Sequence, residues 1–386
     1  MDQGTNKIFF ALLRSAINGV PLTEGERGEF SPKLLPALLK LASRHDIAHL
    51  LVWGLKQNDL ISKETISIEN NILKAICRHE RLDYEYKNLC AALEKAQIPF
   101  LPLKGAVIRR SYPQPWMRTS CDIDILVRRE HLDRAISYLS DNLDYAEKGK
   151  GVYDVSLFSP MDIHVELHFD LVDEGRAGNP LEILGNVWDN VSLCEGSEYR
   201  YEMSDAFYYF YHVAHMAKHF ETGGCGIRPF IDLWILDHMD GVDKSARDEL
   251  LSSSKLLKFA EVSRKLSAVW FGGDEKDSLS EQMEEFLLHG GVYGSSDNRV
   301  ALNQKKRGGR FGYVLRRMFA PTARLRRYYP ILERHPWLMP VMQVRRWFML
   351  LKPDVARMAK REMAANKSLD RGKADEMGVF MNNIGL

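Results

Sequence analysis

The sequence feature that most constrains this chain is an alternation of carboxylates and aliphatic residues at 122–127, Asp-Ile-Asp-Ile-Leu-Val. A period of two is typical of a β-strand with one apolar face, so Asp122 and Asp124 point to the same side. Two carboxylates this close repel each other, and a divalent metal is the natural compensation. The segment therefore predicts a strand with a candidate metal site. Solvated acids on a surface strand would be the better interpretation if the Asp-x-Asp stood alone.

A second acidic segment, at 162–169, repeats this pattern. Its polar residues share one strand face: Asp162, His164, Glu166 and His168. If the two strands are neighbours in one sheet, three carboxylates converge, which suits Mg²⁺ or Mn²⁺ bound together with substrate phosphates. Glu166 and Asp162 both qualify as the third carboxylate on geometry alone. His164 and His168 could be ligands or proton carriers, although a strand histidine is more often only hydrogen-bonded.

Two further strands are expected, one between the two acidic segments and one before them, and they complete a small sheet. Residues 152–158 alternate as a strand, and the following Ser-Pro turn predicts an antiparallel hairpin with the second acidic strand. Upstream, 99–103 is expected to be a strand that leads to a turn at Lys104-Gly105 and a helix over 106–112. A glycine at such a turn lets the backbone approach a phosphate, and a helix N-terminus adds N–H groups and a positive dipole.

Arg118 lies four residues before the first acidic strand. Its guanidinium could bind a triphosphate through two parallel hydrogen bonds, or it could pair with Asp122 or Asp124. An ordinary loop arginine is an equally good interpretation. The sequence leaves these roles open.

The order of these elements resembles the nucleotidyltransferase superfamily, whose members include DNA polymerase beta and the aminoglycoside nucleotidyltransferases. A narrower resemblance is to a bacterial branch of largely uncharacterised nucleotidyltransferases. The motifs that carry it are Leu-Lys-Gly at 103–105, the run from Arg118 to Val127, Glu-Leu-His-Phe at 166–169 and His-x-x-Lys-His at 215–219. The likeness extends from the N-terminal helices to Tyr-Pro at 329–330 and Trp-Leu-Met-Pro at 337–340. One departure is Ala106, where the superfamily usually has a serine, and Lys104 could substitute for its hydroxyl.

This resemblance implies an α+β fold, in which a small mixed β-sheet core of the nucleotidyltransferase type is flanked by N-terminal and C-terminal helical regions. Short helices are expected within 8–56 and a longer one over 65–96. The expected regions are an N-terminal helical region at 1–96, the nucleotidyltransferase core at 97–200, a helical domain that completes the pocket at 201–290, and a basic, mostly helical C-terminal region at 291–386.

The resemblance also implies a reaction. A nucleoside monophosphate, with AMP from ATP as the first expectation, would pass to a hydroxyl of an unidentified small-molecule or protein acceptor, with release of pyrophosphate. The implied site residues are the catalytic metal ligands Asp122, Asp124 and Glu166 and the nucleotide-binding residues Lys104, Gly105 and Arg118. The resemblance favours Glu166 over Asp162 as the third carboxylate.

A helix expected over 204–220 carries His212, His215 and His219 on one face. The spacing alone would allow a zinc site, but no cysteine or acid at matching intervals completes it. The resemblance instead implies a wall of the nucleotide or acceptor pocket. Its residues would be Lys218 and Arg228 facing phosphates, with His215, His219 and Asp232 as auxiliaries. The alternative is a helix that packs its histidines against the sheet.

Charge is distributed unevenly along the chain. Residues 299–386 contain 20 Lys or Arg against 6 Asp or Glu, which gives +14 and leaves −13 for residues 1–298 of a chain with net charge +1. This basic region could bind an anionic partner such as nucleic acid or a membrane surface. It could equally dock on the acidic part of the same chain.

Composition limits the classes of protein to which this chain could belong. The chain has no run of about eighteen apolar residues and no signal-peptide pattern, so we expect a cytoplasmic protein without a transmembrane segment. Its five cysteines include no Cys-x-x-Cys pair, which argues against a zinc knuckle or a disulfide framework. Two rival functions stay open. One is a non-catalytic nucleotide-binding or interaction module with a degenerate core, for which Ala106 is the best support. The other, ranked lower, is a transferase that acts on nucleic acid, which the basic region would favour.

Overall fold

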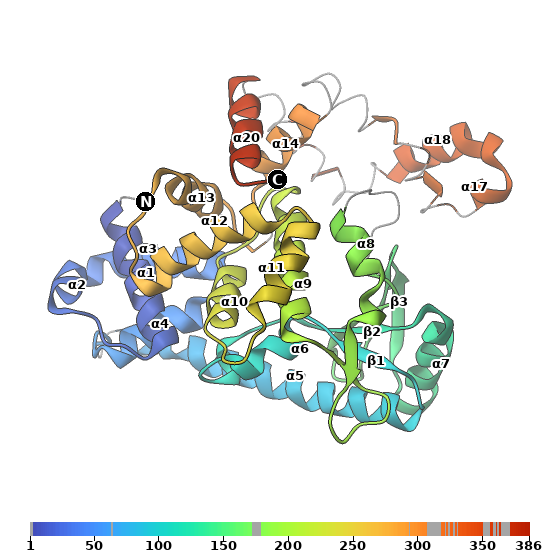
Figure 1. The fold of residues 1–386 in the computed structure, drawn as a ribbon, viewed down its shortest axis with the longest axis horizontal. Coiled ribbons are helices and arrows are strands. Elements are labelled where there is room, and N and C mark those ends of the chain that lie inside the picture. Colours follow the sequence, from blue (N-terminus) through green and yellow to red (C-terminus); the bar gives the residue numbers. More distant parts are fainter. Residues whose placement is uncertain are drawn as a thin grey trace. The chain divides into compact units, whose positions relative to one another are not determined.

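A computed structural model gives the fold of the chain (Figure 1). It describes residues 3–62, 65–171, 179–292, 294–306, 318–320, 322, 325–326, 329, 331–349, 356–357, 360, 363 and 371–386. The chain forms two compact units. One comprises Met1–Ala214 and Ile227–Ser280, and the other comprises His215–Gly226 and Glu281–Leu386. The regions expected from the sequence stay a prediction, and much of the basic C-terminal region lies outside the described residues.

The first unit begins with helices at the positions that the sequence predicted. They are α1 (Gln3–Asn18), α2 (Glu24–Glu29), α3 (Leu35–Arg44), α4 (Ala48–Gln57) and the long α5 (Asn70–Lys95). A capping box starts α2, because the Thr23 hydroxyl accepts from the Glu26 N–H while the Glu26 carboxylate accepts from the Thr23 N–H. The long α5 delivers the chain to the sheet.

Helices α1 and α4 approach each other closely at Gly54. A Cβ atom on Gly54 would lie 2.2 Å from the carbonyl oxygen of Leu12 and 3.0 Å from its carbonyl carbon. Since these are backbone atoms of a packed helix, they can give way only if the two helices separate. Gly54→Ala is therefore expected to lower the free energy of unfolding by about 1–3 kcal/mol, although alanine is the better helix former.

Urea unfolding of Gly54→Ala beside Gly25→Ala measures this effect. Gly25 lies on α2, and a Cβ there would meet no atom within 4 Å. Its replacement by alanine should leave stability unchanged or slightly raised. Equal stabilities for the two variants would contradict the close approach of α1 and α4.

His45 is a fully buried histidine that follows α3. Within the described part of the chain, neither of its ring nitrogens has a hydrogen-bond partner. Burial, with a smaller contribution from the charge of Arg44, lowers its pKa from 6.5 to about 4. The unfolded chain therefore binds a proton that the folded chain excludes, so this contribution to stability is complete above the unfolded pKa and falls as pH drops toward 4. At about pH 5 the expected loss is about 2 kcal/mol.

Urea unfolding at neutral pH and at about pH 5 tests this expectation. His45→Leu should show a shallower fall in stability than the wild type, by the equivalent of about one proton. His335→Leu, a change at an exposed position, serves as the matched control and should keep the wild-type pH dependence. If the free energy of unfolding falls equally in the two variants between neutral pH and about pH 5, His45 is not responsible for the pH dependence.

Five strands form the central sheet of the first unit. They are β1 (Phe100–Pro102), β2 (Asp122–Val127), β3 (Ala146–Lys150), β4 (Asp154–Phe158) and β5 (His164–His168). Their order in the sheet is β1-β2-β5-β4-β3. β2 and β5 are parallel, and the other neighbouring pairs are antiparallel. This mixed sheet confirms the α+β class, the pairing of the two acidic strands and the β4–β5 hairpin.

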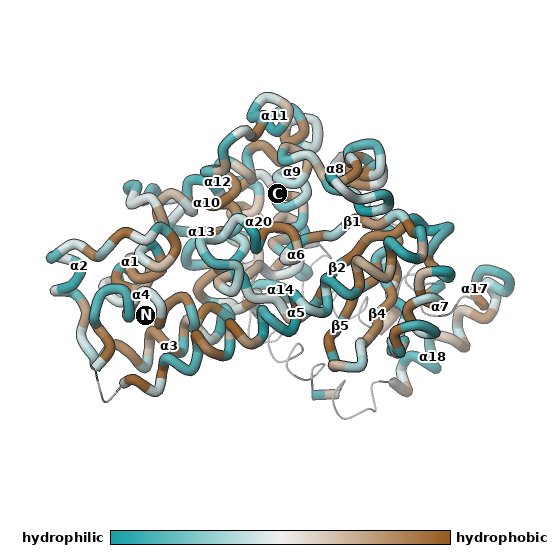
Figure 2. The backbone as a smooth tube through the Cα atoms, turned by 90° about the horizontal axis from the view of Figure 1, so that it is seen from below, coloured by the Kyte–Doolittle hydropathy of each residue, from teal (hydrophilic) through white to brown (hydrophobic). Residues whose placement is uncertain are grey.

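The apolar faces of β2 and β5 pack against α5 and α7 (Leu132–Leu143). Ile123, Ile125 and Leu167 are at most 1% exposed, and they share a core with Leu93 of α5. Figure 2 shows the apolar stretches of β2, β5 and β4 side by side. Because a shift of one residue would turn the carboxylates into this core, burial of the apolar face fixes the register and holds the acids on the opposite face.

Further helices and a two-stranded sheet complete the first unit. The helices are α6 (Gly105–Ile108), α8 (Asn179–Gly185), α9 (Asp205–Phe220) as far as Ala214, α10 (Arg228–Asp237), α11 (Lys244–Ser253), α12 (Leu257–Ser267) and the start of α13 (Ser278–Leu288), and the strands are β6 (Val191–Leu193) and β7 (Tyr201–Met203). The helix expected over 106–112 is thus shorter, with a 3₁₀ turn at Arg109–Ser111. It ends there because Pro113 forces Tyr112 into an extended conformation.

The second unit is helical in its described residues. Beyond the ends of α9 and α13 it contains α14 (Ser296–Lys306), α17 (Ile331–Arg334), α18 (Met339–Met349) and α20 (Arg371–Asn383). The ring of Phe286 on α13 contacts Phe220 of α9 and Phe380 of α20, with centroids 5.3 and 5.2 Å apart. None of the helices that the structure describes, in either unit, combines the length and the apolar character that a bilayer crossing requires.

Candidate active site

The two parallel strands β2 and β5 present the candidate site. Asp122 of β2 lies opposite His164 of β5, and Asp124 lies opposite Glu166. Because side chains alternate between the faces of a strand, these four point away from the apolar core. His168, two residues beyond Glu166, continues the same face.

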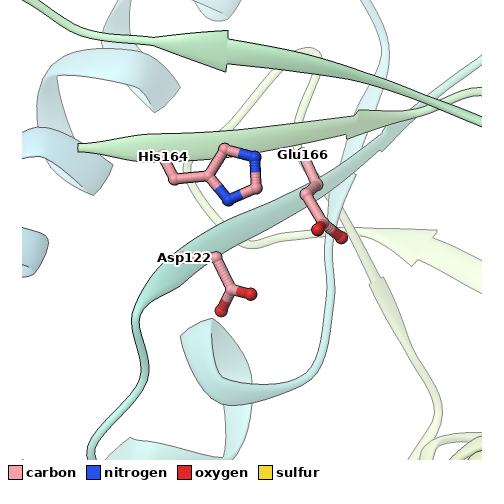
Figure 3. Close-up of side chains that lie close together, drawn as sticks. All are labelled: Asp122, His164 and Glu166. Atoms are coloured by element: carbon pink, nitrogen blue, oxygen red, sulfur yellow. The ribbon is translucent and has the colours of Figure 1, made fainter. Parts of the chain in front are cut away.

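Possible ligand atoms on this face form two overlapping groups. Oxygen or nitrogen atoms of Asp122, His164 and Glu166 lie within 4.8 Å of one another, and so do those of Asp124, Glu166 and His168. Figure 3 shows the first group on one side of the sheet, with Asp122 from β2 and the other two from β5. Glu166 belongs to both groups, so the three carboxylates come together in the way the strand pattern indicated.

Asp124 is the centre of a polar network. It is 4% exposed, its Oδ1 accepts a hydrogen bond from Lys104 Nζ at 2.7 Å, and His168 Nε2 lies 2.9 Å from the same oxygen. Glu166 Oε2 lies 3.9 Å from the Lys104 ammonium and 3.4 Å from His168 Nε2. The His168 ring stacks nearly parallel on Tyr153, with centroids 6.1 Å apart. Lys104 and His168 therefore offset part of the negative charge.

The pKa shifts show that this compensation is uneven. Burial acts to raise the pKa of Asp124, but the ammonium of Lys104 and the hydrogen bond from His168 outweigh it and hold the pKa below its usual range. Burial and the charge of Asp124 raise the pKa of Asp122. The pKa of His168 is raised, because its contacts with Asp124 and Glu166 outweigh burial. Lys104 and His168 therefore compensate the charge of Asp124 more fully than that of Asp122.

The turn at Lys104 has an unusual backbone conformation. Lys104 adopts φ 45° and ψ −123°, a combination that residues with a Cβ rarely take. Tyr208 of α9 donates its hydroxyl hydrogen to the Lys104 carbonyl oxygen at 2.8 Å, and the Leu103 N–H donates to the Asp124 carbonyl at 3.0 Å. These bonds hold the strained turn beside Asp124. Strain of this kind is common at functional positions.

Gly105 allows a different close contact. A Cβ on it would lie 3.3 Å from Ser120 Oγ and 3.6 Å from Arg118 Nη1. Arg109 joins the two segments, since its Nε donates to the Gly105 carbonyl at 2.7 Å and its Nη2 donates to Ser120 Oγ at 2.8 Å. The glycine thus lets the loop 109–121, which leads into β2, pack directly on the turn.

Arg118 pairs with Asp232 of α10, so the interpretation that it pairs with Asp122 or Asp124 is wrong. Its Nε and Nη2 donate to the two carboxylate oxygens of Asp232 at 2.7 and 2.8 Å, and the Tyr112 hydroxyl donates to the same carboxylate at 2.6 Å. Burial acts to raise the pKa of Asp232, but the charge and the hydrogen bonds of the Arg118 guanidinium act in the opposite direction. The net result is a lowered pKa. This fork-to-fork pair fastens the loop 109–121 to α10.

Arg228, expected to face phosphates, holds the same loop from another side. Its Nη1 donates to Asp46 Oδ2 at 3.0 Å and to the Thr119 carbonyl at 2.8 Å. The Thr119 carbonyl also accepts from Arg118 Nη1 at 2.6 Å. Burial and the nearby charge of Arg118 lower the pKa of Arg228. Two arginines therefore converge on one carbonyl, and each is compensated by its own aspartate.

The two ligand groups found among the described residues include none of the other candidate residues. Asp162 is exposed, with φ 58° in the turn before β5, and among the described residues neither ligand group includes it. Lys218, His215 and His219 lie in the part of α9 that belongs to the second unit, where the two histidine rings are 4.5 Å apart. The Nε2 atom of His212, in the first unit, lies 2.9 Å from the Pro229 carbonyl oxygen.

Several residues that build the site were missed from the sequence. Tyr208, Tyr112 and Asp46 support the turn and the loop across long sequence separations, and no local pattern marks them. Asp154 is different, because the alternation of β4 puts it on the polar face, opposite His168. Burial raises its pKa, so it is a further acid at the edge of this site that the pattern could have identified.

The donor set fits a divalent metal. Each of the two groups offers two carboxylates, whose oxygen atoms are the ligands that Mg²⁺ and Mn²⁺ prefer, and one imidazole. The raised pKa of Asp122 reflects burial and negative charge that a bound cation would relieve. Either of the two groups can therefore hold a metal ion.

A family model described as "Uncharacterised nucleotidyltransferase" matches residues 32–272. The match covers more than half of the chain and includes every candidate residue of the site. It ends before the Tyr-Pro and Trp-Leu-Met-Pro segments to which the sequence resemblance was extended. No curated protein and no solved structure matches the chain.

Proposed function

The chain belongs to the family of uncharacterised nucleotidyltransferases, and we propose that it transfers a nucleoside monophosphate from an NTP to an acceptor hydroxyl, releasing pyrophosphate. ATP is the first candidate donor, and a small molecule or a protein is the acceptor class. The observation that carries the proposal is the meeting of Asp122, Asp124 and Glu166 in two ligand groups whose atoms lie within 4.8 Å. The adjoining Lys104 ammonium gives the same face a phosphate-binding cation.

Each residue of the site has a role in this proposal. Mg²⁺ or Mn²⁺, when bound, would neutralise phosphate charge and orient the α-phosphate for in-line attack. Asp122 and Asp124 would hold two such ions, with Glu166, which belongs to both ligand groups, as a further ligand. Glu166, whose side chain is 27% exposed, can reach the acceptor and take the proton of its hydroxyl. The hydroxyl oxygen then bonds to the α-phosphorus while the bond to the pyrophosphate oxygen breaks.

Lys104 and Gly105 are the residues that we assign to the triphosphate. The Lys104 ammonium lies 2.7 Å from Asp124 Oδ1, so it can contact a phosphate oxygen next to that carboxylate. The hydrogen bonds of Arg118 and Arg228 support a role in holding the loop 109–121. A role for Lys218, His215 and His219 in the pocket stays a prediction.

Pyrophosphate release is the direct test. The full-length protein would be incubated with each of the four NTPs and Mg²⁺ or Mn²⁺, in the presence of pooled small-molecule and protein acceptors. Release from one NTP, dependent on the metal and the acceptor pool, would support the proposal and identify the donor. Absence of release with all four NTPs, under conditions where nucleotide binding is measured, would contradict it.

Glu166 and Asp162 make a matched pair for this assay. Glu166→Gln is expected to lower the rate by about a hundredfold or more, because it removes a shared ligand and the proposed base. Asp162→Asn should stay within about threefold of the wild type, since the side chain is outside both ligand groups. Asparagine also tolerates the positive φ of this turn, so the control does not strain the backbone. If Asp162→Asn lost more activity than Glu166→Gln, the third carboxylate would be Asp162 and not Glu166.

One observation favours a second candidate function, a nucleotide-binding module without transfer activity. Lys104 and His168 already lie at 2.7 and 2.9 Å from Asp124 Oδ1, so this carboxylate has counter-charges from the chain itself. A thermal shift with nucleotide that needs no divalent metal, together with no pyrophosphate release, would favour this candidate.

A further inference from the structure

Described residues between 318 and 349 in the second unit form a small apolar cluster. Its core consists of the buried Ala320, Leu325, Tyr329 and Leu332, against which Leu338, Met339 and Met342 pack. Met339 and Met342 of α18 pack against this cluster, and Figure 1 shows α18 next to α17. One face of α18 is therefore directed inward.

The inward face of α18 carries polar groups as well as methionines. Gln343 is 8% exposed, and its Nε2 donates to the Ala320 carbonyl at 3.3 Å. Arg346 Nη1 and Trp347 Nε1 donate to the Met318 carbonyl at 3.1 and 2.8 Å. These bonds fix the rotation of the helix about its axis.

Large apolar side chains are exposed on α18 and on the 3₁₀ turn (Pro336–Leu338) that precedes it. Trp337, Val341, Val344 and Phe348 are 73%, 55%, 44% and 66% exposed. Val341, Val344 and Phe348 are spaced so that they share one side of α18. Trp337 lies in the turn just before this helix, and we call the four residues the apolar stripe. A surface helix normally turns its apolar side to the core. An exposed stripe on a helix whose rotation is fixed by hydrogen bonds marks a surface that another body covers.

The segment that carries the apolar stripe is rich in arginine. Residues 318–349 contain six Arg and one Glu, with no Lys or Asp. Arg326, Arg334 and Arg345 are exposed, and the Arg345 guanidinium lies 5.6 Å from the centroid of the Tyr329 ring. The surface therefore combines protruding tryptophan, phenylalanine and valine side chains with a strong excess of one charge.

We propose that the apolar stripe and its arginines bind the surface of an anionic lipid bilayer. A basic helix with an apolar face lies in the plane of the headgroups, with aliphatic and aromatic side chains in the acyl boundary and cations at the phosphates. Two valines at the centre of the stripe neither stack on bases nor contact phosphates, which disfavours nucleic acid. The excess of positive charge favours an extended anionic partner and disfavours a second copy of this equally basic surface. The proposal goes beyond nucleotide transfer and does not depend on it.

Co-sedimentation of the full-length protein with lipid vesicles tests the proposal. The vesicles would be phosphatidylcholine alone, or phosphatidylcholine with about one third phosphatidylglycerol. The expected result is binding to the anionic vesicles that weakens with salt, and little binding to the neutral ones. Trp337→Ser/Phe348→Ser should lower the partition coefficient by about tenfold or more. Val344→Asp, a single exposed change, should act in the same direction, and Arg334→Gln/Arg345→Gln should reduce the preference for anionic vesicles.

The matched control removes two exposed apolar groups from another helix. Leu73 and Tyr84 of α5 are each 59% exposed, so Leu73→Ser/Tyr84→Ser should bind vesicles as the wild type does. Failure of the wild type to bind anionic vesicles would overturn the proposal, and so would equal losses in the two double variants. Binding to RNA, or self-association, that depends on the stripe in the absence of vesicle binding would overturn it in favour of those partners.

Discussion

Asp124→Asn is expected to lower pyrophosphate release by about a thousandfold or more, since a ligand that places a divalent ion on the phosphates contributes several kcal/mol to the transition state. The substitution removes the charge that holds the Lys104 ammonium at 2.7 Å and keeps the shape of the side chain. Asp122→Asn should have a similar effect. Pyrophosphate release with saturating NTP and metal, measured beside Mn²⁺ binding to the protein without nucleotide, gives two independent readouts, and both should fall.

Asp170→Asn provides the matched control for this loss. Asp170 lies two residues beyond β5 and pairs with Arg129 at 3.3 Å, so the change removes one negative charge near the same strand end but outside both ligand groups. Its activity should remain within about threefold of the wild type. Wild-type activity in Asp124→Asn would refute the metal-assisted mechanism. Loss of activity with full Mn²⁺ binding would limit Asp124 to a role after metal binding.

The central sheet and its acidic face could be predicted because they follow from a local pattern. Alternation at 122–127 and 162–169 has a period of two, and the burial of Ile123, Ile125 and Leu167 leaves the carboxylates no other face. Parallel pairing of β2 and β5 then brings Asp124 and Glu166 side by side. The alternation depends only on neighbouring residues, whereas the pairing of the two strands was a condition that the sequence left open and that the sheet fulfils.

The partners of the arginines could not be predicted in the same way. Arg118 finds Asp232 and Arg228 finds Asp46 across 114 and 182 positions of sequence. Alternation and spacing say nothing about such pairs, because they depend on how helices from distant segments pack around the loop. The turn shows a related limit. The sequence predicts a turn at Lys104-Gly105, but no local pattern marks the positive φ of Lys104, whose carbonyl oxygen accepts a hydrogen bond from Tyr208.

Asp232→Ala is expected to lower the free energy of unfolding by about 3–5 kcal/mol, because it leaves the buried guanidinium of Arg118 without its counter-charge. Asp232 is 1% exposed and accepts three hydrogen bonds, two from Arg118 and one from Tyr112. Urea unfolding at neutral pH measures the loss, and Asp248→Ala on α11, whose side chain is 47% exposed and pairs with Arg247, is the control with little expected effect.

A double variant distinguishes the cost of leaving the Arg118 guanidinium unpaired from the contribution of the Arg118–Asp232 ion pair to stability. Arg118→Met/Asp232→Leu removes both charges and fills much of the space with apolar atoms, so it should be more stable than either Arg118→Met or Asp232→Ala alone. That ordering would show that the cost of Asp232→Ala comes from the unpaired guanidinium. If the double variant instead loses the sum of the two single losses, Arg118 and Asp232 stabilise the fold independently and the fork-to-fork pair does not hold the loop. Because the loop leads directly into Asp122, a stable double variant that still releases pyrophosphate slowly would assign the pair to positioning the metal ligand.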